Sequence, residues 1–263
     1  MNIIVCIKRV PDTADVDIVV DKSGKDIEKS GLVFDLNEWD SYAIEEAIRL
    51  KERLGGTVTV ISMGGEDTNE SLRKCLAMGA DEAIRLTDSA FSGSDGYATA
   101  KVLAQAIRRL PYDLILTGTQ AEDDGFAEVG VMVARLLGLP HVSIVTRLEL
   151  EDRKIRAHRE LEGGLEEVVE VDLPALLTIQ TGINEPRYVS IMGIRKVAKK
   201  EIKVLGLSEL GLQAEEVGLR GSDIELERVF LPPVGEGAQM LEGKPEEIAQ
   251  RVFEILKDKG GLV

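Results

Sequence analysis

Short apolar runs alternate with longer amphipathic stretches through roughly the first half of the chain. The apolar runs have the length and composition of buried parallel strands, and between them apolar positions recur with a helical period. The predicted strands are 3–7, 57–62, 83–86 and 113–118, and the predicted helices are 37–54, 68–78, 95–110 and 127–137. This alternation predicts an α/β fold, a doubly wound parallel sheet with right-handed crossovers.

The stretch from Asp113 to Gly138 combines a strand, a polar loop and a helix in that order. The strand ends at Gly118, the loop contains an Asp124-Gly125 turn signal, and the helix pattern begins near Ala127. The first backbone N–H groups of that helix, around 127–130, have no partner within the helix. Such an end carries a partial positive charge and suits a phosphate.

Two phosphate-binding motifs are excluded here, and an ordinary strand-to-helix turn that binds nothing remains the alternative. Gly125 and Gly130 have the spacing of a P-loop, but Val131 stands where lysine is needed. No G-x-G-x-x-G opens a helix at this place. The acidic run 122–124 opposes a phosphate, so we expect its carboxylates to face solvent or cap the helix, leaving backbone amides to bind.

Several predicted loops converge if the first strand lies beside 113–118. Ligands of doubly wound sheets sit beyond the strands' carboxyl ends, where the strand order reverses. Asn37 is expected to cap the first helix, with Asp40 in the capping-box position. The crevice would be walled by 6–10, 37–40, 62–64 and 119–130.

The pattern changes after Pro140. Short alternating runs within about 142–172 predict a small antiparallel addition, and 175–179 reads as one more apolar strand. Near the N-terminus, 16–24 reads as an exposed hairpin. Beyond Glu201 few core-forming patterns precede a last helix, which predicts an arm that is disordered or lies on another chain.

The composition of the chain limits the binding partners, metal sites and cellular locations that we expect. A net charge of −15 argues against nucleic acid and anionic membranes. The cysteines, Cys6 and Cys75, are expected as reduced core residues, and two histidines offer no transition-metal site. No apolar run is long enough to span a membrane and no signal peptide is evident, so we expect a cytoplasmic protein. No nucleophile–base pair or paired catalytic carboxylates stand out, so no catalytic residue is assigned.

Several motifs resemble the electron transfer flavoprotein β-subunit family. The segment 157–178, AHRELEGGLEEVVEVDLPALLT, is similar to the family signature. The match continues collinearly over nearly the whole chain. It includes Lys8-Arg9-Val10-Pro11, Asn37-Glu38-Trp39-Asp40, LRKCLAMGAD at 72–81 and Asn184-Glu185-Pro186-Arg187-Tyr188.

The resemblance implies a carrier subunit, not an enzyme in its own right. It implies a heterodimer with an α-subunit that holds the redox-active FAD, and a flavin-dependent dehydrogenase as electron donor. Ordinary β-subunits bind AMP, whereas electron-bifurcating members hold a second FAD in that position. The loop 123–130 shares Ala127, Val129 and Gly130 with the bifurcating pattern but has Phe126 for threonine and Glu128 for glutamine. A non-redox nucleotide-binding module is the remaining alternative.

The resemblance implies which residues of this chain would contact the nucleotide, because they stand at the family's contact positions. They are Cys6, Asn37, Glu38, Trp39, Asp40, Met63, Thr119, Gln120, Ala121, Glu122, Asp123, Asp124, Gly125, Phe126, Ala127, Glu128, Val129 and Gly130.

The resemblance also divides the chain. Residues 1–200 are expected to form the nucleotide-binding domain, including a recognition loop at about 184–200 whose tip, Ile191 and Met192, docks on the donor dehydrogenase. Residues 201–263 are expected to form an arm that wraps the α-subunit.

Overall fold

The computed structural model describes residues 1–14, 16–233, 235 and 237–259, which fall into two compact units. The first comprises Met1–Val19 and Glu28–Glu227, and the second comprises Val20–Ile27 with the chain from Arg228 onward. The main sheet and all of its helical covering belong to the first unit.

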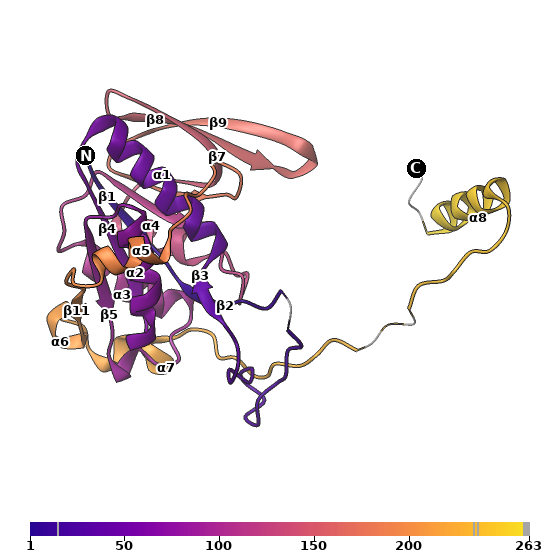
Figure 1. Ribbon diagram of the computed structural model, residues 1–263, viewed down its shortest axis with the longest axis horizontal. Helices are drawn as coiled ribbons and strands as arrows, with labels where there is room; N and C mark the ends of the chain where they lie inside the picture. Colours follow the sequence, from indigo (N-terminus) through magenta and orange to yellow (C-terminus); the bar gives the residue numbers. More distant parts are fainter. Residues whose placement is uncertain (15, 234, 236, 260–263) are drawn as a thin grey trace. The chain divides into compact units, whose positions relative to one another are not determined.

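A nine-stranded sheet forms the centre of the first unit, in the order β11-β5-β4-β1-β6-β10-β7-β8-β9 (Figure 1). The strands from β11 to β7 are parallel, and β8 and β9 continue the sheet antiparallel. The predicted doubly wound sheet with an antiparallel addition is confirmed. The strands are β1 (Asn2–Cys6), β4 (Thr57–Met63), β5 (Glu82–Leu86), β6 (Leu114–Gly118), β7 (His141–Glu151), β8 (Lys154–Leu161), β9 (Leu165–Asp172), β10 (Ala175–Ile179) and β11 (Lys203–Leu205).

Strand order reverses at β1. Ile4 on β1 is in register with Thr59 of β4 on one side and with Ile115 of β6 on the other. The chain therefore builds outward from β1 in one direction through β4 and β5, and then in the other direction from β6. The first strand lies beside 113–118, which meets the condition on which the predicted crevice depends, and a crevice beyond β1 and β6 follows from this order.

Helices cover both faces of the sheet. α1 and α2 share one hydrophobic cluster with the strands, and α3 and α4 share the cluster on the opposite face. Single 3-10 turns lie at Glu66–Thr68, Ser89–Phe91, Glu162–Gly164 and Ala214–Glu216. The helices are α1 (Glu38–Leu54), α2 (Asn69–Met78), α3 (Gly96–Ile107), α4 (Val129–Leu137), α5 (Ile191–Val197), α6 (Leu207–Leu210), α7 (Gly218–Gly221) and α8 (Pro245–Asp258).

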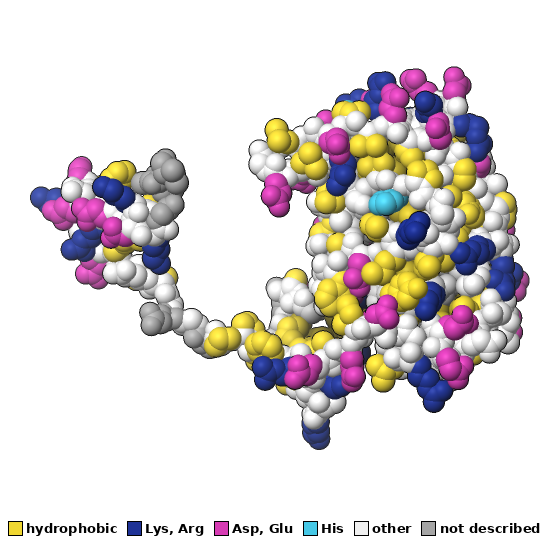
Figure 2. All heavy atoms as spheres, turned by 180° about the vertical axis from the view of Figure 1, so that it is seen from behind, with side chains coloured by type: hydrophobic (Ala, Val, Ile, Leu, Met, Phe, Trp, Pro, Cys, Tyr) yellow, Lys and Arg dark blue, Asp and Glu magenta, His cyan; other side chains and the backbone are white. Residues whose placement is uncertain are grey.

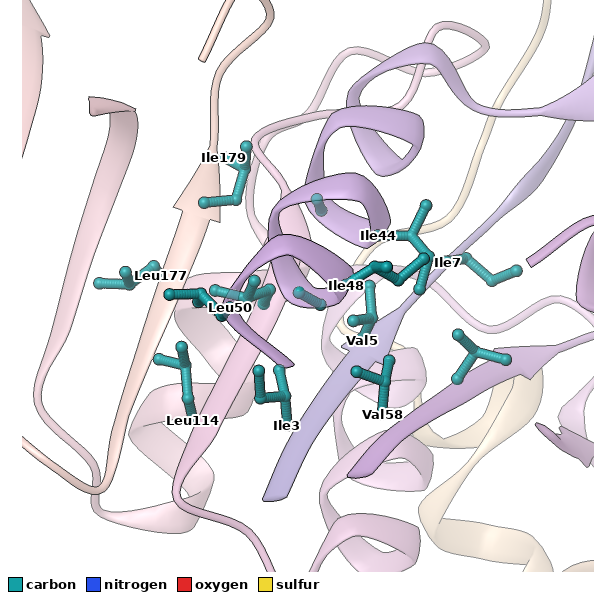
Figure 3. Packing of buried hydrophobic residues seen from close by; sticks show 14 of the residues in the cluster. Ile3, Val5, Ile7, Ile44, Ile48, Leu50, Val58, Leu114, Leu177 and Ile179 are labelled. Atoms are coloured by element: carbon teal, nitrogen blue, oxygen red, sulfur yellow. The ribbon is translucent and has the colours of Figure 1, made fainter. Parts of the chain in front are cut away.

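The packing of α1 holds the centre of the sheet together. Ile44, Ile48 and Leu50 lie over the side chains of β1, β4, β6 and β10 (Figure 3). All three are at most 1% exposed, and burying such a side chain stabilises the fold by roughly 1.5–3 kcal/mol. This packing fixes the N-terminal end of α1 at the crevice.

The N-terminal hairpin expected at 16–24 is present in a shorter form that extends to residue 28. Val20 forms an antiparallel bridge with Ile27, flanked by hydrogen bonds from the Asp21 N–H to the Asp26 carbonyl at 2.9 Å and from the Glu28 N–H to the Val19 carbonyl at 2.8 Å. In the turn, the Asp21 carboxylate accepts hydrogen bonds from the backbone N–H and hydroxyl of Ser23, at 2.9 and 2.6 Å. The regular strand pair nearby is β2 (Arg9–Pro11) with β3 (Phe34–Leu36).

More of the C-terminal region belongs to the first unit than the weak core signal after Glu201 suggests. β11 pairs with β5, and Leu210, Leu212 and Val217 are buried. These segments are only three or four residues long, too short to show a periodic pattern. In the second unit, no residue of α8 is buried, and no described helix is long and apolar enough to cross a membrane.

Charge is distributed over the surface without one large field on the face seen in Figure 2. Acidic and basic side chains are interspersed there around exposed hydrophobic ones. The excess of carboxylates is therefore not concentrated on that face.

Candidate functional site

A cavity of about 320 Å³ lies at the carboxyl ends of the central strands, on the side of β1 and β6 where the order reverses. Ligand pockets generally begin at about 300 Å³. The lining residues are Cys6, Ile7, Lys8, Asn37, Asp40, Met63, Ser94, Asp95, Gly96, Thr99, Leu103, Thr117, Gly118, Thr119, Gln120, Ala121, Asp124, Phe126, Ala127, Glu128, Val129 and Gly130.

Asp40 joins the ends of the two central strands. Its Oδ2 accepts the backbone N–H of Lys8 at 2.7 Å, and its Oδ1 accepts that of Gly118 at 2.9 Å. A side chain at Gly118 is excluded, because a Cβ there would lie 2.5 Å from Asp40 Oδ1. Asp40 therefore sets the separation of the two loops that wall the cavity.

Asn37 connects α1 to the loop after β6. The structure corrects the expected cap, because the Asn37 side chain makes no capping hydrogen bond to the backbone N–H groups of α1. Its Nδ2 donates to the Gln120 carbonyl at 2.9 Å, and its Oδ1 accepts the Glu122 N–H at 3.1 Å. Asn37 is buried, and these two bonds satisfy it by holding the loop in place.

Burial changes the protonation of two lining groups. It raises the pKa of Asp40 to about 7, against the effect of the two backbone N–H groups that favour the carboxylate. It also raises the pKa of the Cys6 thiol to about 12, with a further contribution from the nearby Asp40. Cys6 is therefore a neutral, apolar part of the cavity floor and not a thiolate nucleophile.

The acidic run in the loop is largely paired. Lys8 Nζ contacts Asp123 Oδ1 at 2.6 Å and Asp124 Oδ2 at 2.8 Å. Glu122 Oε1 accepts the N–H of Glu38 at 3.3 Å, at the start of α1. The carboxylates thus bind Lys8 and the first turn of α1. These partners are far away in the sequence, so the local sequence pattern could not predict them.

The first turn of α4 offers free backbone donors to the cavity. The first hydrogen bond at its start runs from Met132 N to the Glu128 carbonyl at 3.0 Å, so the N–H groups of residues 129–131 precede it. Ala127 has φ +56°, a left-handed conformation that turns the chain into the helix. These features suit an anion at the cavity wall.

Gly130 has a packing role in this arrangement. A Cβ there would lie 2.5 Å from Thr117 Oγ1 and 2.9 Å from Thr178 Cγ2. The glycine therefore lets the first turn of α4 approach β6 and β10 closely. Substituting it would disturb the fold as well as any ligand.

The structure brings most of the predicted contact residues to the cavity, but five of them lie outside its lining. Trp39 points away, and its indole Nε1 donates to Gln180 Oε1 at 2.7 Å. The five are Glu38, Trp39, Glu122, Asp123 and Gly125.

The largest contribution that sequence reasoning missed comes from the start of α3. Ser94, Asp95, Gly96, Thr99 and Leu103 form one wall of the cavity. Asp95 caps the helix by accepting the Ala98 N–H at 2.8 Å. An Asp-Gly pair before an apolar period signals this helix start, and the carboxyl end of β5 lies at the same edge as those of β1 and β6. Thr117 and Gly118 are the other missed lining residues, whereas Ile7 and Lys8 lie within the stretch 6–10 that the sequence places in the crevice wall.

The start of α5 exposes an aliphatic tip, and the segment that leads to it is firmly held. Ile191 and Met192 are 70% and 69% exposed, and Ser190 Oγ accepts the Gly193 N–H at 3.1 Å. At the base, Asn184 Nδ2 donates to the Tyr42 carbonyl at 3.0 Å. The segment that leads to the tip is thus anchored on α1, the helix whose N-terminus borders the cavity.

Comparison with known proteins identifies a single family. A model described as the electron transfer flavoprotein domain matches residues 26–210. An electron transfer flavoprotein subunit beta from Thermoanaerobacterium thermosaccharolyticum is 43% identical over 260 residues, covering 98% of this chain and 99% of the relative. One from Methylophilus methylotrophus is 38% identical over 265 residues, covering 99% and 100%. The caffeyl-CoA reductase-Etf complex subunit CarD from Acetobacterium woodii is 40% identical over 262 residues, covering 98% and 99%.

Proposed function

This chain belongs to the electron transfer flavoprotein family as a β-subunit, and from that premise we propose that it pairs with an α-subunit to carry electrons from a flavin-dependent dehydrogenase to an acceptor. The redox-active FAD is held mainly by the α-subunit. The chain itself holds a structural AMP in the cavity beyond β1 and β6. The observation that carries the proposal is the position of this cavity at the strand reversal, in a chain whose relatives match along their whole length.

The cavity fits an adenine mononucleotide. Its volume of about 320 Å³ is at the lower end of the range for ligand pockets. Ile7, Met63 and Leu103 provide apolar surface for a flat base, while the first turn of α4 provides N–H groups for a phosphate. The ribose, which joins the base to the phosphate, would lie against the backbone around Thr119. AMP bound there would hold together loops from four elements.

A bifurcating subunit with a second FAD in the same position is the second candidate. One observation favours it: Ala127, Val129 and Gly130, at the start of α4, match the pattern of the bifurcating members. In that case the adenosine monophosphate half of FAD takes the place of AMP in the cavity, and the flavin lies outside it.

The C-terminal arm is proposed to lie against the α-subunit. α8 exposes Val252, Phe253, Ile255 and Leu256, at 37–57% of their surface. An amphipathic helix with no buried residue in its own chain has an apolar face to cover. Contact with a partner would bury that face, which supports the proposed heterodimer. We propose that this heterodimer is cytoplasmic.

Ile191 is proposed to dock on the dehydrogenase, and replacing it should slow electron transfer without unfolding the protein. Ile191→Ala removes an exposed anchor, which at an interface centre is worth roughly 2 kcal/mol or more. We expect reduction of the heterodimer's flavin by the dehydrogenase to weaken by more than about tenfold, with unchanged melting temperature and flavin content. Stopped-flow kinetics with varied dehydrogenase concentration measures this.

Leu54→Ala is the matched control, because Leu54 is also an exposed aliphatic residue, at the far end of α1. It should leave the kinetics unchanged. A drop in melting temperature for Ile191→Ala with normal kinetics would assign Ile191 to the core and remove the docking role.

A further inference from the structure

The carboxylate of Glu128 lies beside the first turns of two helices in the wall of the cavity. Glu128 directly precedes α4, yet its side chain makes no capping hydrogen bond to that helix. It reaches toward α3, because a Cβ atom built at Gly96 would lie 2.1 Å from Glu128 Oε1 and 2.8 Å from its Cγ. The glycine at 96 therefore leaves the space that this carboxylate occupies.

The charges around Glu128 are mostly negative. Asp95 faces it from the start of α3, and Asp124 faces it from the loop before α4. Asp95 Oδ1 accepts the Ala98 N–H, and its Oδ2 accepts N–H groups of residues 223 and 224. Lys8 is the one cation in the cavity lining as described, and it is bound to Asp123 and Asp124.

No hydrogen bond or ion pair reaches the Glu128 carboxylate from any residue that the structure describes. Burial, followed by the charges of Asp95 and Asp124, raises the pKa of Glu128 above its ordinary value. Glu128 is therefore a cavity-lining carboxylate without a compensating donor, on the residue that directly precedes the free N–H groups at the start of α4.

A phosphate on those N–H groups would add negative charge next to Glu128. Like charges within about 4–6 Å disfavour one another, and a shared proton removes the conflict. We propose that Glu128 determines the charge state in which this subunit accepts a nucleotide phosphate, so that binding takes up one proton, which the carboxyl and a phosphate oxygen share. This inference rests on the proposed nucleotide site and adds to it a specificity-determining residue.

The proton balance fixes the direction of the pH dependence. The free protein has an ionised carboxylate, the bound state has a carboxyl that donates to the phosphate, and the proton comes from solvent. Affinity is therefore highest below the pKa of Glu128 in the free protein. It falls by about tenfold per pH unit until the pKa in the complex is reached, and is constant above it.

The test is calorimetric titration of the heterodimer, stripped of nucleotide, with AMP and separately with FAD. Repeating each titration at about pH 7 in two buffers of different ionisation enthalpy counts the protons bound. We expect an uptake approaching about one proton for the natural protein and near zero for Glu128→Gln. At about pH 8 the variant should bind about tenfold more tightly, and near pH 5.5 the two should converge.

The two ligands separate the possible sources of the proton. AMP has a second phosphate ionisation near about pH 6, whereas the diphosphate of FAD has no ionisation in that range. Uptake that persists with FAD and disappears in Glu128→Gln belongs to the carboxyl. Uptake with AMP alone, equal in both proteins, would overturn the inference.

Glu122→Gln is the matched control, since Glu122 lies in the same loop but outside the cavity lining. It should keep the full proton uptake. Should Glu128→Gln fail to fold, as judged by its melting temperature, Glu128→Ala replaces it with the same expectation. Binding without uptake, unaffected by either variant, refutes the role of Glu128 alone, whereas no binding of either ligand to any protein refutes the nucleotide site itself.

Discussion

Replacing Arg187 with alanine is expected to lower the free energy of unfolding by about 3 kcal/mol, the lower end of the cost of removing one partner from a buried ion pair, because Glu45 is buried whereas Arg187 is partly exposed. Arg187 Nε contacts Glu45 Oε2 at 2.8 Å, and its Nη1 contacts Glu52 Oε1 at 2.8 Å. The Glu45 side chain is only 3% exposed. Without Arg187, this buried carboxylate retains Arg49, at 2.9 Å, as its one charged partner among the residues that the structure describes.

Chemical denaturation of the heterodimer, followed by circular dichroism, measures the loss. Arg156→Ala is the control, because Arg156 and Glu170 also form an ion pair but are each 55% exposed. Such surface pairs contribute at most about 1 kcal/mol. Equal effects of the two substitutions would show that the Arg187 cluster has no structural role.

Asp40→Ala is expected to have the second largest effect, on both stability and nucleotide retention. The substitution leaves the buried N–H groups of Lys8 and Gly118 without an acceptor, at roughly 1–3 kcal/mol each. The loops after β1 and β6 then lose the group that spaces them. We expect a destabilisation of about 2 kcal/mol or more and loss of bound nucleotide from the purified heterodimer.

Asp40→Asn retains one hydrogen-bond acceptor and does not titrate. It therefore separates the effect of the charge at position 40 from the effect of the side chain's size and shape. The pKa of Asp40 is raised to about 7 in the folded chain, above its unfolded value of about 3.9. The folded state then binds the proton more tightly, so this stabilisation is complete below about pH 4 and is lost as pH rises through about 7. The natural protein should lose stability relative to Asp40→Asn across that interval. A constant difference across the interval would contradict the raised pKa.

The sheet could be predicted because each central strand is an unbroken apolar run. Ile3–Ile7 and Leu114–Thr117 are buried on both faces, so their composition alone distinguishes them from half-exposed strands. Their placement as neighbours entered only as a condition, which the strand order of the structure satisfies. The crevice could therefore be predicted from the sequence under that condition.

The roles of individual side chains were less accessible, because distant partners decide them. Asn37 has the chemistry of a helix cap, but the loop carbonyl of Gln120 and the N–H of Glu122, more than 80 positions away, bind it instead. Gly130 suggested close approach of a phosphate, yet Thr117 and Thr178 are what require its lack of a side chain. The local sequence pattern shows which roles a residue type can have, and contacts with distant parts of the chain decide which of these roles it takes.

The wall contributed by α3 shows a third limit. Asp95 and Gly96 mark a helix start that the sequence reveals, but nothing local states that this start faces the α4 N-terminus. That relation depends on β5 and β6 lying on opposite sides of β1 and β4, with α3 crossing between them. Once the strand order is known, the start of α3 can be placed in the cavity.

Identification of every nucleotide released from the heterodimer tests the central claim most directly. The chain is purified with its co-expressed α-subunit, the complex is denatured, and the released compounds are quantified by chromatography and mass spectrometry. The account predicts FAD and AMP in equal amounts, and two FAD per heterodimer would establish the bifurcating arrangement. Release of FAD with no second adenine nucleotide would contradict the proposed role of the cavity beyond β1 and β6.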